Sequence, residues 1–378
     1  MRAASAVASG DSEALRAAFA HDRPFTLGIE EEVMLLDPVS LDLAPRAEDA
    51  LVRCRDDVRF RSELPAAQLE IVLPPAATVA EIAGALDDAR RALRRAADGI
   101  GLLAGAGVHP FARGEGTLSR GERYERIERE FGSVARRQLV FGLHVHVAVP
   151  GAGLALAVYN AVREHLPAVA ALGAGSPYHE GADSGLASVR PTISTLLPRQ
   201  GIPPAFASWQ EFVDALAWGA ESGAFPDVAQ WWWEARLHPL HGTLEIRVPD
   251  TQSTVDDTAA IAAVCHALVV RLAQRIESGE VGPPAPSWRI AENRWSACRH
   301  GTSGTWHDVR TERPEPMADH LHRLLDDLAA TARVLGCERE LAHARDLVTR
   351  PRAGWARDVV ATAGVRGLVA CLADRFVG

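Results

Sequence analysis

The stretch at residues 25–36 constrains the fold most, because it sets three consecutive acids, Glu30, Glu31 and Glu32, inside an apolar run. Side chains of a β-strand alternate between two faces. One face of this strand would carry Leu27, Ile29, Glu31, Val33 and Leu35, and the other Gly28, Glu30 and Glu32. Two carboxylates side by side on a strand face repel unless a cation neutralises them, and a divalent, oxygen-preferring ion such as Mg2+ is the natural candidate.

Three further segments repeat this design of one apolar face and one ligand-bearing face. In the segment 63–73, Gln68 and Glu70 share a strand face, and Glu63 precedes the strand. In the segment 141–147, His144 and His146 share a face. In the segment 242–250, Glu245 and Arg247 share a face. Alternating charge on a single strand usually marks the solvated face of an antiparallel sheet. Four strands whose polar faces lack lysine and serine instead predict a sheet with a core on one side and an active-site floor on the other.

Length and charge bound the class of protein. The 378 residues are enough for one large domain or two ordinary ones, and 47% apolar residues suit a full core. A net charge of −9 without a concentrated basic face argues against a nucleic-acid partner. Arg90, Arg91, Arg94 and Arg95 fall on one expected helix, and we assign them to its solvated side.

Two features of composition narrow the chemistry and the compartment. The chain has no lysine, which excludes a P-loop lysine and a Schiff-base lysine, so any nucleotide phosphate must be held by arginine, metal and backbone. The five cysteines are scattered, without metal-site or redox spacing, which predicts free thiols in a reducing cytoplasm. The start is too short and polar for a signal peptide, and we expect no membrane span.

The order of expected elements is mixed rather than strictly alternating, which predicts an α+β fold with an antiparallel sheet. Residues 1–23 are expected to be a flexible terminus, and 24–378 a single catalytic domain whose part from about 312 is helical. Thr78 and Glu81 form a capping box that opens a helix. The stretch 254–276 is apolar almost all round, which predicts a buried helix.

Short motifs along nearly the whole chain together resemble the glutamate–cysteine ligase type 2 family of bacterial carboxylate–amine ligases. The matching pieces lie at 28–32, 107–110, 123–124, 142–147, 176–181, 199–204, 232–236, 243–250 and 293–295. The resemblance implies a glutamine-synthetase-like core, a curved antiparallel sheet flanked by helices. It also implies that ATP phosphorylates a carboxylate and that an amine then displaces the phosphate. Two departures put the substrate in question: Glu234 stands where the family usually has Asp, and Leu237-His238 stands where it tends to have Pro-Ser.

By resemblance and strand face, we assign roles to a set of residues. The expected Mg2+ ligands are Glu30, Glu32, Glu63, Glu70, His144 and Glu245. The expected catalytic residues are Arg247, Glu30 and Glu245, with Arg247 over the transferring phosphoryl group. Substrate binding is assigned to Arg236, Arg190, His146 and Gln68, and ATP binding to Arg247, Asn293 and Arg294.

Several alternatives stay open from the residues alone. His144 could touch phosphate rather than metal, Arg247 could form only a structural ion pair with Glu245, and Asn293 and Arg294 could belong to a structural helix start. Three other functions compete with the ligase hypothesis for the whole protein: a phosphotransferase on the same scaffold, a non-catalytic binding protein, and a zinc-dependent hydrolase at His144 and His146. The expected partners are a small-molecule carboxylate, an amine and a second copy of the chain.

Overall fold

The computed structural model describes residues 10–225, 230–311 and 313–376. These residues form a seven-stranded antiparallel sheet in the order β2-β3-β1-β5-β9-β8, with β4 paired to β1. Its strands are β1 (Leu27–Leu36), β2 (Phe60–Ser62), β3 (Gln68–Val72), β4 (Leu102–Ala104), β5 (Leu143–Val147), β8 (Ala235–His238) and β9 (Thr243–Ile246). Two small pairs complete the strands, β6 (Tyr178–His179) with β7 (Ala182–Asp183), and β10 (Thr305–His307) with β11 (Pro314–Pro316).

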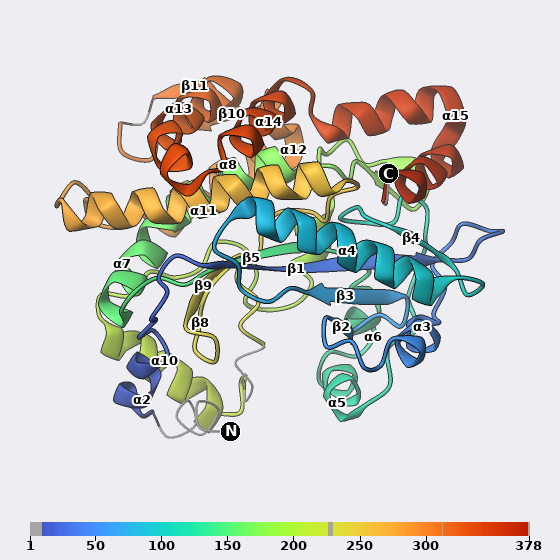
Figure 1. The fold of residues 1–378 in the computed structure, drawn as a ribbon, viewed down its shortest axis with the longest axis horizontal. Coiled ribbons are helices and arrows are strands. Elements are labelled where there is room, and N and C mark those ends of the chain that lie inside the picture. Colours follow the sequence, from blue (N-terminus) through green and yellow to red (C-terminus); the bar gives the residue numbers. More distant parts are fainter. Residues whose placement is uncertain (1–9, 226–229, 312, 377–378) are drawn as a thin grey trace.

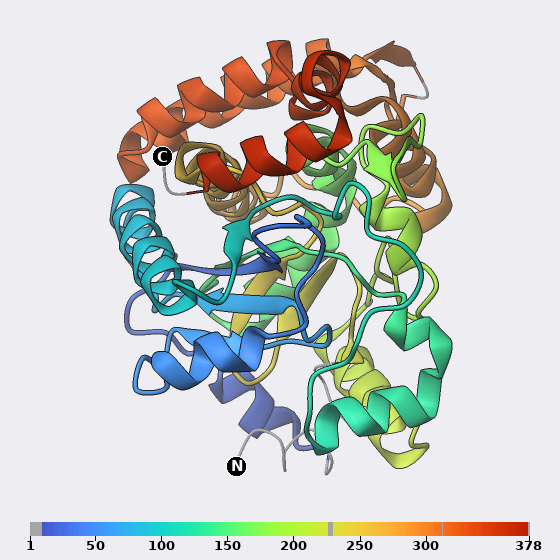
Figure 2. The ribbon, with the colours of Figure 1, turned by 90° about the vertical axis from the view of Figure 1, so that its right-hand side faces the viewer.

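Helices flank this sheet on its two sides (Figures 1 and 2). They are α2 (Ser12–Ala17), α3 (Ala47–Arg53), α4 (Val79–Ala97), α5 (Glu122–Phe131), α6 (Ser133–Arg136), α7 (Ala152–Val162), α8 (Leu166–Gly173), α9 (Arg190–Ser194), α10 (Trp209–Glu221), α11 (Val255–Glu277), α12 (Ser287–His300), α13 (Met317–Leu335), α14 (Glu338–Thr349) and α15 (Arg352–Arg375). The expected α+β class is confirmed, because the helices and the antiparallel strands alternate irregularly along the chain.

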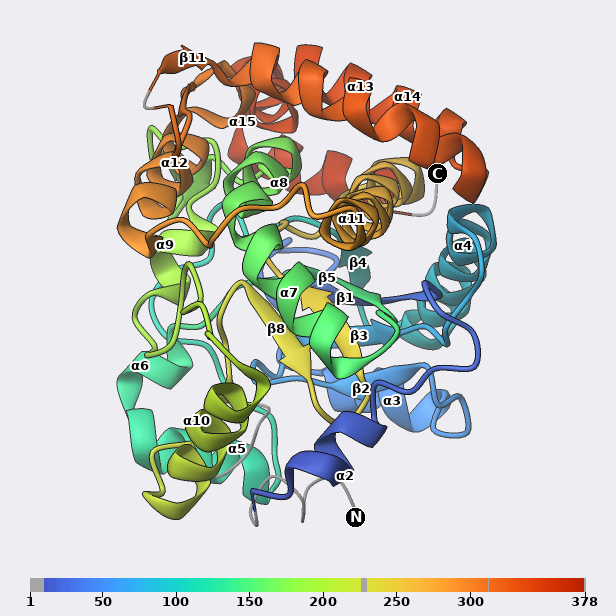
Figure 3. The same ribbon diagram turned by 90° about the vertical axis from the view of Figure 1, so that its left-hand side faces the viewer.

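The apolar face of the sheet packs against α4, α7 and α11 (Figures 1 and 3). Leu27, Ile29, Val33 and Leu35 point into this layer and are at most 1% exposed. Helix α11 is the buried helix that the sequence predicted. It is the one described helix long and apolar enough to cross a membrane by length and composition, yet 78% of its apolar window is buried inside the molecule, as in the core of a globular protein.

Glu31 lies on the apolar face, as the regular alternation of β1 predicted, and its charge is met by Arg90 of α4. The two side chains are fully buried and joined by hydrogen bonds of 2.6 and 2.9 Å. The expectation that Arg90 lies on the solvated side of its helix is therefore wrong, although Arg91, Arg94 and Arg95 are exposed. A carboxylate on the core face needs a cation there, and Arg90 shares the inward stripe of α4.

The N-terminal segment departs from the expected flexible terminus in the part that the structure describes. Helix α2 begins after Asp11, whose side chain accepts a hydrogen bond from the Ala14 amide, and both Leu15 and Phe19 are fully buried in the core. Residues 1–9 lie outside the described residues. At the other end, the expected helical region begins at Met317, directly after β11.

Candidate active site

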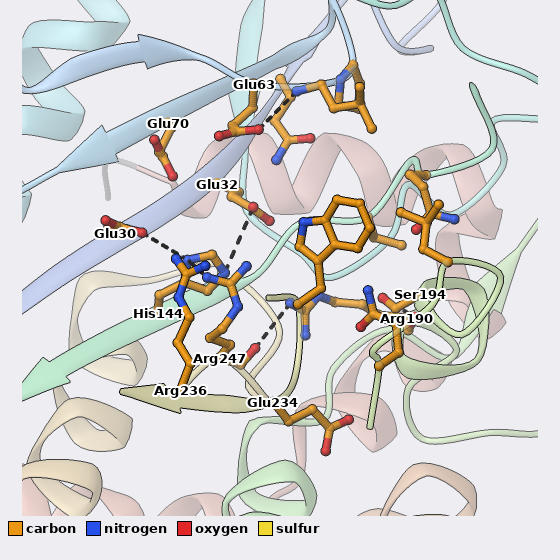
Figure 4. Close-up of a pocket in the computed structure, with 18 of the residues that line it drawn as sticks. Glu30, Glu32, Glu63, Glu70, His144, Arg190, Ser194, Glu234, Arg236 and Arg247 are labelled. Carbon is orange, nitrogen blue, oxygen red and sulfur yellow. Dashed lines mark hydrogen bonds and ion pairs between the residues drawn. The ribbon is translucent and has the colours of Figure 1, made fainter. Parts of the chain in front are cut away.

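The polar face of the sheet carries a cavity of about 290 Å3. Figure 4 shows four acids, Glu30, Glu32, Glu63 and Glu70, on one side and the arginines on the other, with Glu234 beyond the arginines. Nine of the residues assigned from the sequence line this cavity: Glu30, Glu32, Glu63, Gln68, Glu70, His144, Arg190, Arg236 and Arg247. The structure thus brings together side chains from β1, β3, β5, β8 and α9, with Glu63 directly after β2 and Arg247 directly after β9.

Strand register explains why these side chains converge. Glu32 of β1 lies directly opposite Glu70 of β3, and Glu30 lies opposite His144 of β5. One row further, His146 lies opposite Glu245 of β9, which is in turn opposite Arg236 of β8. Because paired residues of neighbouring strands point to the same face, the rows stack all of these side chains on one floor.

Glu30 is the centre of the acid–histidine cluster. Its Oε2 lies 3.1 Å from His144 Nδ1, and its Oε1 lies 3.4 Å from His146 Nε2. Burial raises the pKa of Glu30, but the hydrogen bonds and charges of the two histidines outweigh it and hold the pKa well below its ordinary value. Burial, together with the charge of Arg247, lowers the pKa of His144 to about 4. At neutral pH, Glu30 is therefore a carboxylate beside a neutral His144 imidazole.

Glu245 is fully buried between two arginines. Arg236 and Arg247 each donate a short hydrogen bond to it. Burial raises the pKa of Glu245, yet these two positive charges outweigh it and lower the pKa well below its ordinary value. Arg247 also lies 3.4 Å from His144 Nδ1, so it stands between the Glu245 pair and the cavity. Arg247 thus forms its ion pair with Glu245 and lines the cavity at the same time, and the ion pair orients the Arg247 guanidinium.

The pKa values of Glu32 and Glu70 are raised, in contrast to the lowered pKa values of Glu30 and Glu245. Burial raises the pKa of Glu32 to about 7 despite the charge of Arg190. Burial raises the pKa of Glu70 well above its ordinary value, and the charges of Glu63, Glu30 and Glu32 raise it further. Together these carboxylates form a cluster with too little positive charge around it, which is the arrangement expected of groups that share a divalent cation.

Two groups of possible ligand atoms meet around Glu30 among the described residues. Glu30, Glu70 and His144 form one, and Glu30, His146 and Glu245 form the other; within each, the ligand atoms lie within 4.8 Å of one another. Glu30 belongs to both groups, so Glu30, Glu70, His144, His146 and Glu245 are the residues that could hold a divalent cation here. The donors are mostly carboxylate oxygens, which suits Mg2+.

Contacts from distant segments fix the acids in place. Glu32 accepts a short hydrogen bond from the Gly142 amide, and Thr251 Oγ1 donates to the carbonyl oxygens of Glu32 and Gly142 at 2.8 and 2.9 Å. A Cβ at position 142 would displace the guanidinium of Arg190, so glycine there lets Arg190 lie against β5. Arg190 itself donates to the carbonyl oxygens of Arg247 and Val248 at 3.2 and 3.1 Å.

Four assigned residues lie outside the cavity lining. Glu245 and His146 sit directly behind it, in contact with Glu30 or Arg247. The Asn293 side chain is fully buried and exchanges two hydrogen bonds with the backbone of His307, and Arg294 pairs with Glu234. The structure gives these two residues structural contacts, and a role of theirs in ATP binding stays a prediction.

Several lining residues carried no assigned role. Arg61 of β2 lies opposite Glu70, and Trp232, Glu234, His238 and His241 also line the cavity. Arg61 could have been found from the alternation of its short strand. The position of Trp232 and Glu234 depends on a loop whose path the sequence pattern does not encode.

Comparison with known proteins identifies the family. The pattern of glutamate-cysteine ligase family 2 (GCS2) matches residues 26–367. A Rubrobacter xylanophilus protein provisionally named glutamate–cysteine ligase 2-3 is 39% identical over 328 residues, covering 85% of this chain and 88% of that one. A Corynebacterium efficiens protein provisionally named glutamate–cysteine ligase 2-1 is 34% identical over 330 residues, covering 86% and 87%.

The chain belongs to glutamate-cysteine ligase family 2. It is accordingly a ligase, as the resemblance of the motifs predicted. The solved glutamate–cysteine ligase of Francisella tularensis, in complex with AMP, shares the fold with a TM-score of 0.71 at 11% identity, covering 95% of this chain and 90% of that one. A bifunctional glutathione synthetase from Pasteurella multocida gives a TM-score of 0.67 at 14% identity, covering 98% of this chain and 54% of that one.

Proposed function

We propose that this member of the family joins a small carboxylic acid to an amine, using ATP and Mg2+ through an acyl-phosphate intermediate. The observation that carries the proposal is the convergence of Glu30, Glu32, Glu70 and His144 on one side of a cavity that Arg247 closes on the other. Glutamate and cysteine are the first substrates to test, since the relatives are named for them. The free cysteines support a cytoplasmic location, and a homodimer stays a prediction.

The chemistry needs charge neutralisation and positioning more than covalent help. A carboxylate does not react with an amine in water, whereas an acyl phosphate has an electrophilic carbonyl and a good leaving group. Magnesium, when bound, would offset the charge of the ATP phosphates, and Glu30, Glu32, Glu63, Glu70, His144 and Glu245 would hold it. His146, which the sequence assigned to substrate binding, joins this set, because its Nε2 lies 3.4 Å from Glu30 and 3.8 Å from Glu245.

The arginines supply the complementary charge. Arg247 is held by Glu245 with part of its guanidinium toward the cavity, where it would bind the transferring phosphoryl group. Arg236 shares Glu245 and keeps that carboxylate ionised, and Arg190 would attract the carboxylate substrate. Gln68 lines the acid side, where its amide can donate to a bound oxygen.

A phosphate-release screen tests the proposal. Wild-type protein with ATP and Mg2+ is assayed against a matrix of amino acids and amines, with product amides identified by mass spectrometry. We expect orthophosphate and amide in equal amounts, and only when both acid and amine are present. A phosphorylated acid that accumulates without amine would indicate the phosphotransferase, and tight stoichiometric zinc without ATP turnover would indicate the hydrolase.

A further inference from the structure

The N-terminal segment, residues 11–23, contacts the turn that joins β8 to β9. His21 Nε2 donates a hydrogen bond of 2.6 Å to the carbonyl oxygen of Gly242 in that turn. Figures 1 and 3 show α2 beside this end of the β8–β9 hairpin. The segment lies before residue 26, where the match to the family pattern begins. A part of the chain outside the family pattern therefore touches the hairpin that carries Arg236 and Glu245.

The contact is close, and Gly242 permits it in two ways. The backbone of Gly242 has a φ of +65°, in the left-handed region that side chains other than glycine rarely adopt. A Cβ at this position would also meet the carbonyl group of Ala18, which belongs to the backbone and cannot swing aside as a long side chain can. The turn and the N-terminal segment therefore fit each other at the level of the backbone.

The N-terminal segment is itself fixed to the core. Leu15 and Phe19 are fully buried, and the ring of Phe19 packs edge-on against Trp209 of α10 at a centroid distance of 5.4 Å. The Phe19 carbonyl oxygen accepts a hydrogen bond of 2.8 Å from the Gly151 amide, before α7. Because two other parts of the fold hold the segment, His21 presents a fixed donor to the turn.

The hairpin is the part of the sheet that is easiest to move. Strand β8 lies at the edge of the sheet and, within the described part of the chain, pairs only with β9. In the turn, residues 239–242, the Gly242 amide donates to the His238 carbonyl oxygen at 2.8 Å, and both Leu240 and His241 are exposed. Edge elements with exposed turns open at a lower cost in free energy than central strands. The hydrogen bond from His21 therefore acts where support from outside the sheet matters most.

The same turn forms a wall of the cavity. His238, Leu240 and His241 all line it, and the rings of the two histidines stack at a centroid distance of 4.2 Å. The ring of His146 lies 5.9 Å from that of His238 and 6.0 Å from that of His241, and His146 Nε2 lies 3.4 Å from Glu30. A shift of the turn would therefore move the imidazoles that lie next to the acid–histidine cluster.

We propose that the N-terminal segment positions this wall of the cavity, and that His21 is the positioning residue. The inference rests on the proposed function in one respect, that the cavity binds the substrates. His21 does not line the cavity, so it acts only through the turn. With the hydrogen bond in place, His238, Leu240 and His241 stay where the substrates meet them; without it, the turn opens more often and the cavity is complete for a smaller fraction of the time.

Hydrogen–deuterium exchange of the full chain, followed by mass spectrometry, tests the contact directly. His21→Ala removes the hydrogen bond and keeps the buried Leu15 and Phe19, so the fold is retained. Protected amides of the β8–β9 hairpin should exchange about five-fold faster than in wild type, which is about 1 kcal/mol at 1.36 kcal/mol per ten-fold, while those of β3 should keep their rates. His21→Gln can donate its side-chain amide to the same carbonyl oxygen and should retain most of the protection.

Substrate kinetics then separate positioning from a contact that serves only stability. With the acid and amine that give the highest wild-type rate of phosphate release, His21→Ala should raise the KM of at least one substrate about two- to five-fold and keep kcat within about two-fold, because a smaller fraction of the protein is competent to bind. His21→Gln should restore the KM. Asp22→Ala is the control, since Asp22 is exposed and has no hydrogen bond or ion pair with any residue that the structure describes, and it should match wild type in both measurements.

Two results would overturn the inference. Unchanged exchange of the hairpin in His21→Ala would show that the segment does not hold the turn, and faster exchange with every KM unchanged would show that the turn does not serve binding. Exchange is measured without turnover, whereas the ligase proposal fails if wild type releases no phosphate with any acid and amine. The two failures are therefore distinguishable.

Discussion

Replacing Glu32 by glutamine should stabilise the metal-free protein and, at the same time, reduce its response to Mg2+. Glu32 stands opposite Glu70 at the acid side of the cavity, where its side chain is mostly buried, with 14% exposed. Burial raises its pKa from the ordinary 4.5 to about 7. Above pH 7 the folded metal-free protein must therefore keep a carboxylate ionised in a place that disfavours its charge.

The sign and size follow from linkage. A pKa that is higher in the folded than in the unfolded state costs nothing below pH 4.5, and the cost grows as the pH rises to about 7. A rise from 4.5 to about 7 corresponds to about 3 kcal/mol at 1.36 kcal/mol per pKa unit, reached above pH 7. At pH 5 the cost falls to roughly 1 kcal/mol or less. Glu32→Gln removes this cost and can still accept the hydrogen bond from Gly142 through its amide oxygen.

Thermal unfolding with EDTA and with Mg2+, at pH 5 and pH 8, measures the effect. For 378 residues, an unfolding entropy of about 2.1 cal/mol/K per residue converts about 3 kcal/mol into a rise of about 4 °C. We expect this rise for Glu32→Gln at pH 8 with EDTA, and a rise of roughly 1 °C at pH 5. Added Mg2+ should raise the Tm of wild type, because a bound ligand stabilises the folded state, and should raise that of the variant much less.

The exposed Glu292 of α12 gives the control, since Glu292→Gln should change stability by less than about 0.5 kcal/mol at either pH. If Glu32→Gln were less stable than wild type at pH 8 without metal, the carboxylate would not be under electrostatic strain. If Mg2+ stabilised wild type and the variant equally, Glu32 would not take part in cation binding. Either result would refute the reasoning.

Further predictions concern catalysis and the core. Arg247→Lys should lose most phosphate release, because a lysine cannot form two parallel hydrogen bonds to a phosphoryl group; a loss of only a few-fold would mean that Arg247 is structural. Glu30→Gln should lower turnover strongly and weaken Mg2+-dependent ATP binding while leaving the fold intact; wild-type kinetics would remove Glu30 from the site. Arg90→Met should destabilise the protein by about 3–5 kcal/mol in urea titrations, because it leaves Glu31 buried and unpaired, whereas the double variant with Glu31→Leu should recover much of that loss. Burial raises the pKa of Asp257, but the ion pair with Arg352 outweighs burial and lowers that pKa below its ordinary value. Asp257→Asn should therefore reduce the free energy of unfolding by about 2–4 kcal/mol at neutral pH, and this difference from wild type should vanish as acid protonates the wild-type carboxylate. A difference that does not depend on pH would contradict the pairing.

The sequence by itself determined which side chains share a face. Alternation along a strand is a local property, so Glu30 and Glu32 could be set apart from Glu31, and Glu245 could be set beside Arg247, before any partner was known. The capping box at Thr78 was equally local, and the structure confirms it. The resemblance of the motifs to a known family then predicted the reaction, the joining of a carboxylate to an amine, that residues on these faces would catalyse.

Only the tertiary structure decided which segments meet. The placing of Glu70 opposite Glu32 depends on strand register, and the crossing of Arg190 over Gly142 depends on how α9 docks against the sheet. From the sequence, Arg90 was assigned to the solvated side with the three other arginines of its helix, and only the packing of α4 over β1 reveals its buried partner. Long-range pairing and packing are set by the sum of many contacts, and a pattern read along one stretch of chain does not contain them.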